Sequence, residues 1–357
     1  MPHRILVINP GSTSTKIAVF EDLNNVFTET LRHTNEELAP FSNVADQFEF
    51  RKSVILAALD KHEVPVNSLS VVVGRGGMLK PIKSGTYEVN EKMLSDLKNP
   101  QRGEHASNLG AIIAADMAKS IPDCKAFIAD PIVVDELIPV ARIAGHPLFS
   151  RISIFHALNH KAIGKRYAAS IGKSYADLNL IIAHLGGGVS VGAHEKGQVI
   201  DVNNALNGEG PFSPERSGTL PAYALAELCF SGKYTFPQIT KIITGEGGLV
   251  AHLGTNSFNI VEKRVEEGDK KAILLSDAFA FNVAKSIGAS AAVLKGKVDA
   301  IILTGGVAHN TKLMDKIDEM VRFIAPVKVY PGEDEMSALA ENALAVISGK
   351  ESPLEYN

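Results

Sequence analysis

The sequence predicts an α/β protein whose two domains are built on one plan. Residues 5–19 and 180–191 each contain an apolar strand, a turn rich in glycine, serine or threonine, and a second apolar strand. Downstream of each hairpin, a further apolar run ends in a diglycine, at residues 71–77 and 301–306. One such pair of segments would be ordinary in any α/β protein. Two pairs in the same order favour a duplication.

The turns of the two hairpins suit a phosphate group. Backbone N–H groups in a tight turn form an anion-binding concavity, and glycine lets a phosphate approach the backbone closely. The residues predicted to do so are Gly11, Ser12 and Ser14 in the first turn and Gly186, Gly187 and Gly188 in the second.

Length and composition narrow the class of protein. With 357 residues the chain is long for one core and sufficient for two domains. The net charge of -4, from 36 Lys+Arg and 40 Asp+Glu, argues against a nucleic-acid partner. The N-terminal segment lacks a signal-peptide pattern and no uncharged apolar run reaches membrane-spanning length, so we expect a cytoplasmic protein without a membrane partner. Cys124 and Cys229 are far apart, which predicts inert buried thiols rather than a disulfide or a thiolate metal site.

In the first half, apolar periodicity predicts alternating strands and helices. Val44, Phe48, Ile55 and Leu59 recur at helical spacing in the first of these helices. The strands are expected near residues 4–9, 15–20, 27–33, 70–74 and 125–129, and the helices near 43–61 and 104–119.

The second half repeats the alternation around a long polar loop at residues 203–218. Loops of this length inside compact domains are more often functional than accidental. We expect helices at 155–171, from about 220, at 270–295 and at 336–348, and strands at 180–185, 189–194, 198–202 and 298–304. The apolar helical stretches 220–229 and 278–294 suit either the core or a dimer interface.

The sequence does not contain the common phosphate-binding and metal-binding motifs. Gly172-Lys173-Ser174 is the second half of a P-loop, but Tyr167 stands where the first glycine is needed. The glycines at 186–188 do not complete GxGxxG, because Val191 stands at its last position. His156 and His160 are four residues apart without the glutamate of HExxH.

Five polar residues near strand ends or in the long loop remain as candidates for chemistry. Arg75 follows an apolar strand among glycines and suits bidentate anion binding, and Arg216 lies in the long loop. Asp130 ends a strand, where active-site groups of open α/β folds collect. The alternatives are a surface ion pair, a solvated loop cation and a turn-forming Asp-Pro. His156 and His184 could equally be satisfied core histidines.

Several motifs together resemble the acetate and butyrate kinase family, within the superfamily of actin-like ATPases, sugar kinases and Hsp70. The similarity runs from end to end, and each motif alone is weak. The matching segments are residues 9–16, 74–77, 103–108, 155–160, 184–188 and 210–218. The resemblance implies two duplicated RNase H-like domains with mixed sheets flanked by helices, facing across a cleft. The first would span 1–150, with a C-terminal helix within 333–357 returning to it, and the second 151–332.

The resemblance further implies reversible transfer of a phosphoryl group from ATP to a short-chain carboxylate such as butyrate, directly and in line, with Mg²⁺. Matching residues carry the family's roles. The implied catalytic residues are Arg75, Asp130, His156, His184 and Arg216. The implied nucleotide- and phosphate-binding residues are Asn9, Gly11, Ser12, Ser14, Lys16, Gly186, Gly187, Gly188, Gly305, Gly306, Val307 and Asn310. The implied metal-binding residues are Glu335 and Asn9, with Glu333 as an alternative to Glu335.

Two departures from the acetate kinase pattern concern the substrate. Gly187 replaces the asparagine of HLGNG, and residues 155–160 read FHALNH in place of FHGTSH. Both match the butyrate branch, although acetate, propionate or isobutyrate remain possible acids because each methylene changes binding by only about 1–3 kcal/mol. Two other readings stay open: a kinase acting on a hydroxyl, with Asp130 as its base, and an ATP-dependent binding protein. A homodimer or higher homo-oligomer is expected.

Overall fold

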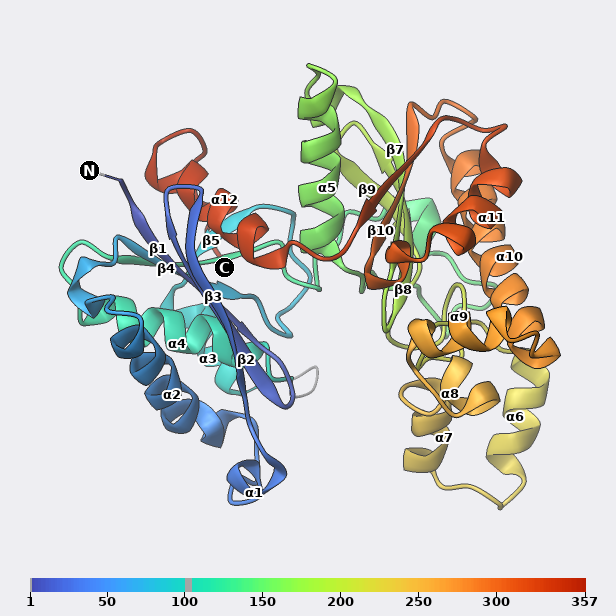
Figure 1. The fold of residues 1–357 in the computed structure, drawn as a ribbon, viewed down its shortest axis with the longest axis horizontal. Coiled ribbons are helices and arrows are strands. Elements are labelled where there is room, and N and C mark those ends of the chain that lie inside the picture. Colours follow the sequence, from blue (N-terminus) through green and yellow to red (C-terminus); the bar gives the residue numbers. More distant parts are fainter. Residues whose placement is uncertain (1, 100–104) are drawn as a thin grey trace. The chain divides into compact units, whose positions relative to one another are not determined.

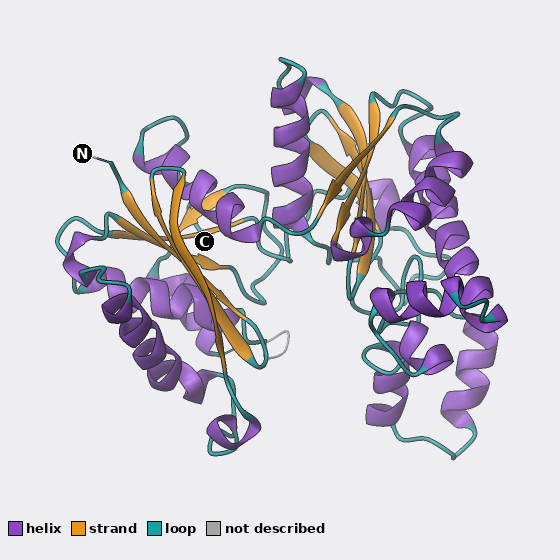
Figure 2. Cartoon of the chain, viewed as in Figure 1, coloured by secondary structure: helices purple, strands orange, loops and turns teal. Residues whose placement is uncertain are grey.

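A computed structural model describes residues 2–99 and 105–357. The chain forms two compact units. Unit 1 contains the residues up to Val134 together with Asp334–Asn357, and unit 2 is Asp135–Glu333. Each unit is a sheet flanked by helices (Figures 1 and 2).

The sheet of unit 1 is mixed. Its strands are β1 (Arg4–Pro10), β2 (Ser14–Glu21), β3 (Asn24–Arg32), β4 (Val71–Arg75), β5 (Thr86–Glu88) and β6 (Lys125–Ala129), in the order β3-β2-β1-β4-β6-β5. The pairs β1/β2, β2/β3 and β5/β6 are antiparallel, whereas β1/β4 and β4/β6 are parallel.

The sheet of unit 2 repeats this plan. Its strands are β7 (Asn179–Leu185), β8 (Val189–Glu195), β9 (Gln198–Val202), β10 (Ala300–Gly305) and β11 (Val327–Pro331), in the order β11-β10-β7-β8-β9. As in unit 1, the first two strands form a hairpin, and the first of them, β7, pairs in parallel with the next long apolar strand, β10. The predicted duplication of two α/β domains is confirmed.

The helices of unit 1 cover both faces of its sheet (Figure 1). They are α1 (Asn35–Leu38), α2 (Phe48–Lys61), α3 (Glu91–Lys98), α4 (Asn108–Lys119) and α12 (Glu335–Ile347). Leu6, Ile8, Ile17 and Val19 alternate along β1 and β2 and pack with α2 and α4 in one core. The C-terminal helix α12 packs on β1, β4 and β6.

The central strands β7 and β10 of unit 2 are buried and mostly apolar on both faces, as expected of strands with helices packed on each side of the sheet. Its helices are α5 (Ala157–Ser170), α6 (Ala222–Phe230), α7 (Phe236–Ile243), α8 (Gly248–Leu253), α9 (Phe258–Glu266), α10 (Lys270–Val293) and α11 (Thr311–Val321). Ile181 and Ala183 pack in the core formed with α10 and α11, whereas Leu180 and Ile182 pack in the core on the α5 side.

The predicted elements lie within a few residues of their expected bounds where the structure describes them. The helix expected at 104–119 begins at Asn108, and Gly103 and Glu104 lie outside the described residues. The structure adds α1, β5, α3, α7, α8, α9, α11 and β11, which we did not predict.

The boundary between the units falls after Val134 and not at residue 150. The segment that follows Val134 is bound to unit 2. Glu136 Oε2 accepts hydrogen bonds from Lys161 Nζ at 2.6 Å and from the backbone N–H of Val199 at 2.8 Å. The backbone N–H of Ile138 donates to the carbonyl of Ile200 at 3.1 Å.

Within the described residues, one helix, α10, is long and apolar enough by length and composition to cross a membrane. Core helices of soluble proteins pass the same test, and the buried residues Phe279, Val283 and Ile287 of α10 pack in the core of unit 2. Cys229 is exposed on α6, so the expectation of a buried thiol was wrong there. Cys124 is half-buried, and burial raises the pKa of its thiol to about 11.

The contact of β4 with α4 requires glycine at position 74. A Cβ there would overlap the backbone carbonyl of Gly110. We expect Gly74→Ala to lower the free energy of unfolding by about 1–3 kcal/mol, because packed backbone cannot move aside. Gly288→Ala on α10, where a Cβ meets nothing within 4 Å, should instead raise it by about 0.5–1 kcal/mol. Urea unfolding followed by circular dichroism measures both, and equal stabilities would contradict the close packing.

Candidate active site

Three of the candidate residues meet in unit 1. Asn9 near the end of β1, Arg75 at the end of β4 and Glu335 at the start of α12 form what we call the unit 1 cluster. Asn9 Nδ2 donates to Glu335 Oε2 at 2.6 Å, and Arg75 Nη1 donates to the same oxygen at 3.2 Å and to Asn9 Oδ1 at 3.4 Å. The parallel pairing of Ile8 with Gly74 brings these strand ends together.

The first glycine turn is exposed but held from behind. Gly11 N donates to Ser14 O at 2.7 Å, and Ser12 is exposed to solvent. Behind the turn, the fully buried Arg51 of α2 donates from Nη2 to Ser12 O at 3.0 Å and from Nη1 to Ser14 O at 2.9 Å. Its Nε donates to Gln47 Oε1 at 2.9 Å.

Burial lowers the pKa of Arg51 to about 10, so its guanidinium is charged at neutral pH. A cation directly behind an exposed turn makes that turn more attractive to an anion. Sequence reasoning missed Arg51. The sequence did carry a signal for it. Arg51 lies between Phe48 and Ile55 on the buried side of the predicted helix, where a charged side chain needs hydrogen-bonding partners.

Asp130 lies directly after β6 with φ at 40°. Its buried carboxylate accepts through Oδ1 from Ser84 Oγ at 2.6 Å and from the Gly85 backbone N–H at 2.8 Å. One oxygen of this carboxylate is thus occupied in holding the 84–85 backbone, which agrees with the turn-forming alternative for this residue.

In unit 2, the two candidate histidines are stacked. The rings of His156 and His184 lie 3.8 Å apart between centroids, with 11° between their planes. His184 is buried near the end of β7, and its Nδ1 is 3.0 Å from Asn159 Oδ1. Its Nε2 lies 3.0 Å from Glu333 Oε1, yet no hydrogen bond to Nε2 is found among the described residues. His156 Nδ1 lies 2.9 Å from Ser190 Oγ.

Arg216 folds back onto the second glycine turn. Its Nη1 donates to Ala205 O at 2.5 Å, and burial lowers the pKa of its guanidinium. A Cβ on Gly188 would overlap that guanidinium. Ser213 Oγ donates to Gly187 O at 2.5 Å and accepts from Arg216 N at 3.0 Å, so the long loop is tied to the turn. We call His156, His184, Arg216 and the 186–188 turn the unit 2 cluster.

The third glycine turn lies at the same edge of the unit 2 sheet. Thr304 pairs with His184 in the β7/β10 ladder, so Gly305 and Gly306 follow beside the 186–188 turn. Gly305 has φ at 93° and approaches the carbonyl of Leu185, whereas a Cβ on Gly306 would meet nothing within 4 Å. Val307 is buried in the core, and Asn310 Oδ1 accepts from Leu313 N at 2.9 Å to cap α11.

No group of three or more His, Cys, Asp or Glu side chains among residues 2–99 and 105–357 is arranged to hold a metal. Mg²⁺ does not need such a group, because it keeps several waters and takes one or two carboxylates beside substrate phosphates. The carboxylate of Glu335, already held by Asn9, fits this need for oxygen ligands.

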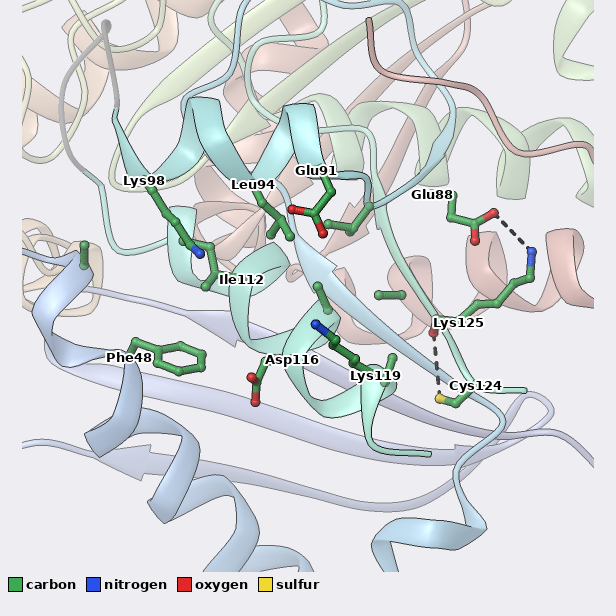
Figure 3. A pocket seen from close by; sticks show the side chains of 15 residues that line it. Phe48, Glu88, Glu91, Leu94, Lys98, Ile112, Asp116, Lys119, Cys124 and Lys125 are labelled. Carbon is green, nitrogen blue, oxygen red and sulfur yellow. Dashed lines mark hydrogen bonds and ion pairs between the residues drawn. The ribbon is translucent and has the colours of Figure 1, made fainter. Parts of the chain in front are cut away.

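Unit 1 also contains a pocket of about 720 Å³ away from its cluster, beside α2, α3 and α4 (Figure 3). Phe48, Leu94 and Ile112 contribute apolar walls, and Glu88 and Lys125 at its edge form an ion pair of 3.1 Å. None of the candidate site residues lines this pocket.

Two mixed sheets built on one plan, each flanked by helices and with a glycine turn beside its strand ends, have the architecture of duplicated actin-like ATPase domains. The chain belongs to the Acetokinase family, whose profile matches residues 147–354. It is 56% identical over 354 residues to Butyrate kinase 1 of Clostridium acetobutylicum, covering 99% of each chain. It is 56% identical over 356 residues to Butyrate kinase 2 of the same organism, covering 100% of each. The chain is therefore a carboxylate kinase that uses ATP, and the hydroxyl-kinase and binding-protein readings are set aside.

The solved structures agree on the fold. Acetate kinase of Porphyromonas gingivalis superposes with a TM-score of 0.77 at 18% identity, covering 97% of this chain and 100% of that one. A propionate kinase from Francisella tularensis gives a TM-score of 0.74 at 17% identity, covering 95% and 98%. The predicted class of duplicated actin-like domains is confirmed.

The contact of Gly188 with Arg216 predicts a separable effect on activity. We expect Gly188→Ala to displace the guanidinium and to lower kcat/KM by up to about 10²-fold, since a shift of about 1 Å in a positioned group can cost that much. Gly187→Ala adds the same methyl group where its nearest contact is Glu215 Oε2 at 3.8 Å, and it should lose less. Steady-state kinetics compares the two variants. Equal losses would show that the turn itself, and not Arg216, is sensitive.

Proposed function

We propose that the chain reversibly transfers the γ-phosphoryl group of ATP to butyrate, or to a short or branched acid of similar size, giving an acyl phosphate and ADP. The observation that carries this choice of acid is the 56% identity, over essentially the whole chain, to two proteins named butyrate kinase. The two clusters supply groups that this reaction needs.

The chemical difficulty is one of charge. A carboxylate is an anionic nucleophile and must approach an anionic phosphate, so positive groups have to offset the repulsion and align the reactants. Each cluster offers one guanidinium, Arg75 in unit 1 and Arg216 in unit 2. We propose that these arginines hold the substrate carboxylate and the phosphoryl oxygens.

Hydrogen-bond donors are needed where charge develops on the transferring group. We propose that His156 and His184 supply them. Their stacking supports this role, because two rings 3.8 Å apart present neighbouring edges at the carboxyl end of β7. Asp130 would orient neighbouring groups through the 84–85 backbone that it holds.

The three glycine turns are the proposed phosphate and nucleotide contacts. Gly11, Ser12, Ser14 and Lys16 would serve in unit 1, and Gly186, Gly187, Gly188, Gly305 and Gly306 in unit 2. The open space at the Cβ position of Gly306 leaves room for a ligand against the backbone, whereas Val307 and Asn310 would act by shaping the loop.

We propose that Mg²⁺ accompanies ATP and is held, directly or through its waters, by Glu335 and Asn9. When bound, the ion would neutralise charge on the phosphates. The 2.6 Å contact of Asn9 with Glu335 supports this pairing, and Glu333, which faces His184, is the weaker candidate.

We also propose that the protein is cytoplasmic and forms a homodimer or a higher homo-oligomer. Helix α6 supports self-association because it is apolar in sequence and none of its residues is buried, with Tyr223 78% and Phe230 92% exposed. By contrast, the stretch 278–294, our other candidate interface, belongs mainly to the core.

The proposal predicts a ranking of acids. In an assay that traps acyl phosphate with hydroxylamine, butyrate and its branched neighbours should turn over faster than acetate, because each methylene adds about 1–3 kcal/mol of discrimination. Arg75→Ala should lower kcat/KM by about 10²–10³-fold. Arg4→Ala, at the other end of β1 in a partly exposed ion pair with Glu21, is the matched control and should retain activity. Turnover of acetate alone would overturn the proposed substrate.

The metal assignment predicts different responses from two neighbouring glutamates. Glu335→Gln should raise the Mg²⁺ concentration for half-maximal activity by about 10–100-fold, by loss of the carboxylate. Glu333→Gln should leave that concentration nearly unchanged and alter kcat through His184. Activity titrated with Mg²⁺ at fixed ATP measures both variants, and the reverse pattern would move the metal to Glu333.

A further inference from the structure

A chain of hydrogen-bonding side chains runs behind His156 through unit 2. His156 Nδ1 is 2.9 Å from Ser190 Oγ, and Ser190 Oγ is 2.8 Å from His160 Nε2. His160 Nδ1 is 3.1 Å from His194 Nε2, and His194 Nδ1 is 2.5 Å from the hydroxyl of Tyr175.

The residues of this chain come from α5, from β8 and, for Tyr175, from the short 3-10 helix Tyr175–Asp177. His156 and His160 are one helical turn apart at the start of α5, and Ser190 and His194 lie on one face of β8, with Gly192 between them. A Cβ on Gly192 would press within 3.3 Å of both His160 Nδ1 and His194 Nε2. The glycine therefore leaves the room in which the two histidines meet.

The inner members are buried and uncharged. Ser190, His160 and His194 are each 0% exposed. Burial, followed by nearby positive charge, lowers the pKa of His160 and His194 well below the usual range. A neutral imidazole has one ring hydrogen, so each of these rings donates to one neighbour and accepts from the other.

The direction of these hydrogen bonds, from donor to acceptor, is set at Tyr175, the residue farthest from His156. If the Tyr175 hydroxyl donates to His194 Nδ1, as the acidity of a phenol and the basicity of an imidazole nitrogen favour, the direction of every other hydrogen bond is fixed. His194 then donates from Nε2 to His160, and His160 donates from Nε2 to Ser190. The Ser190 hydroxyl is left to donate to His156 Nδ1.

We propose that Ser190, His160, His194 and Tyr175 are positioning residues that hold His156 in the tautomer with its hydrogen on Nε2. In that tautomer the ring donates a hydrogen bond from the edge away from Ser190, as a phosphoryl oxygen requires. The proposal rests on the proposed role of His156. Which ring nitrogen carries the hydrogen is set by the hydrogen bond made by the other.

The first test is direct. Ring ¹⁵N spectra of the protein labelled at histidine report which nitrogen of each ring carries hydrogen, and His156→Gln assigns the His156 signals. We expect Nδ1 of His156 unprotonated and Nε2 protonated in the unaltered enzyme. In Ser190→Ala and Tyr175→Phe the two tautomers of His156 should mix. A His156 ring protonated on Nδ1 in the unaltered enzyme would overturn the proposal.

Kinetics supplies the second test. Ser190→Ala should lower kcat about tenfold or more with KM for ATP and acid changed less than about twofold, because the variant removes the hydroxyl that orients His156 without removing a contact to either substrate. Tyr175→Phe should act in the same direction but less strongly, and Ser190→Thr, which keeps a hydroxyl, should recover most of the kcat. Tyr167→Phe on α5, outside the chain, should match the unaltered enzyme. Thermal melting identifies any variant that does not fold. If Ser190→Ala does not fold, the effect of Tyr175→Phe on kcat decides the test.

These experiments distinguish failure of the proposed role of His156 from failure of the positioning role of the residues behind it. If His156→Gln keeps full activity, the proposed role of His156 fails, while the ¹⁵N spectra still decide whether the chain sets its tautomer. If His156→Gln is inactive but Ser190→Ala and Tyr175→Phe change neither the tautomer nor kcat, the positioning role fails alone.

Discussion

Parallel pairing of the first strand of each hairpin with the next long apolar strand is the constraint on which both clusters depend. β1 runs beside β4 and β7 runs beside β10, so the turn after each first strand lies next to the end of its neighbour. That edge is where open α/β sheets bind ligands, because backbone groups and short loops converge there. Asn9 thereby comes beside Arg75, and His184 beside Gly305, from positions far apart in sequence. The duplication means that one topological rule places both sets of groups.

Close backbone approach then sets where glycine is required. Gly74 lets β4 lie on Gly110 of α4, and Gly305, at φ 93°, lies against the carbonyl of Leu185. Gly188 leaves the space filled by the guanidinium of Arg216. In each case the missing Cβ brings a strand end or turn closer to its neighbour than another residue would allow. Glycines that would be read only as phosphate contacts therefore also determine the packing of the sheet edges.

The sequence alone predicted the duplication, most strands and the candidate arginines and histidines, because alternation, strand-end polarity and motifs are local signals. It did not predict the short strand β5, which depends on pairing with β6, nor helices α7 to α9. The sequence also did not reveal that Arg51 binds the first turn. Nor did it reveal that Ser190 contacts His156 and that Asn159 contacts His184, because these partners are far apart along the chain. The boundary near residue 150 also failed, because Glu136 and Ile138 bind β9, a pairing no local pattern reveals. Long-range partners were thus the part that the sequence could not supply.

Stability alone does not account for the polar interior of unit 2. A buried hydrogen-bonded group contributes only about 0.5–1.5 kcal/mol net, and a matched pair of apolar residues often serves as well. His160 and His194 must also give up their charge to be buried together, as the lowering of their pKa values records. What they provide that apolar side chains could not is direction, since each neutral ring donates on one side and accepts on the other. The same argument applies to Arg51 in unit 1, a buried cation that donates hydrogen bonds to two backbone carbonyls of an exposed turn. In both units a buried polar group hydrogen-bonds to atoms at the sheet edge, Arg51 to two backbone carbonyls and Ser190 to His156, and such fixed contacts are the preorganisation that phosphoryl transfer from one anion to another demands.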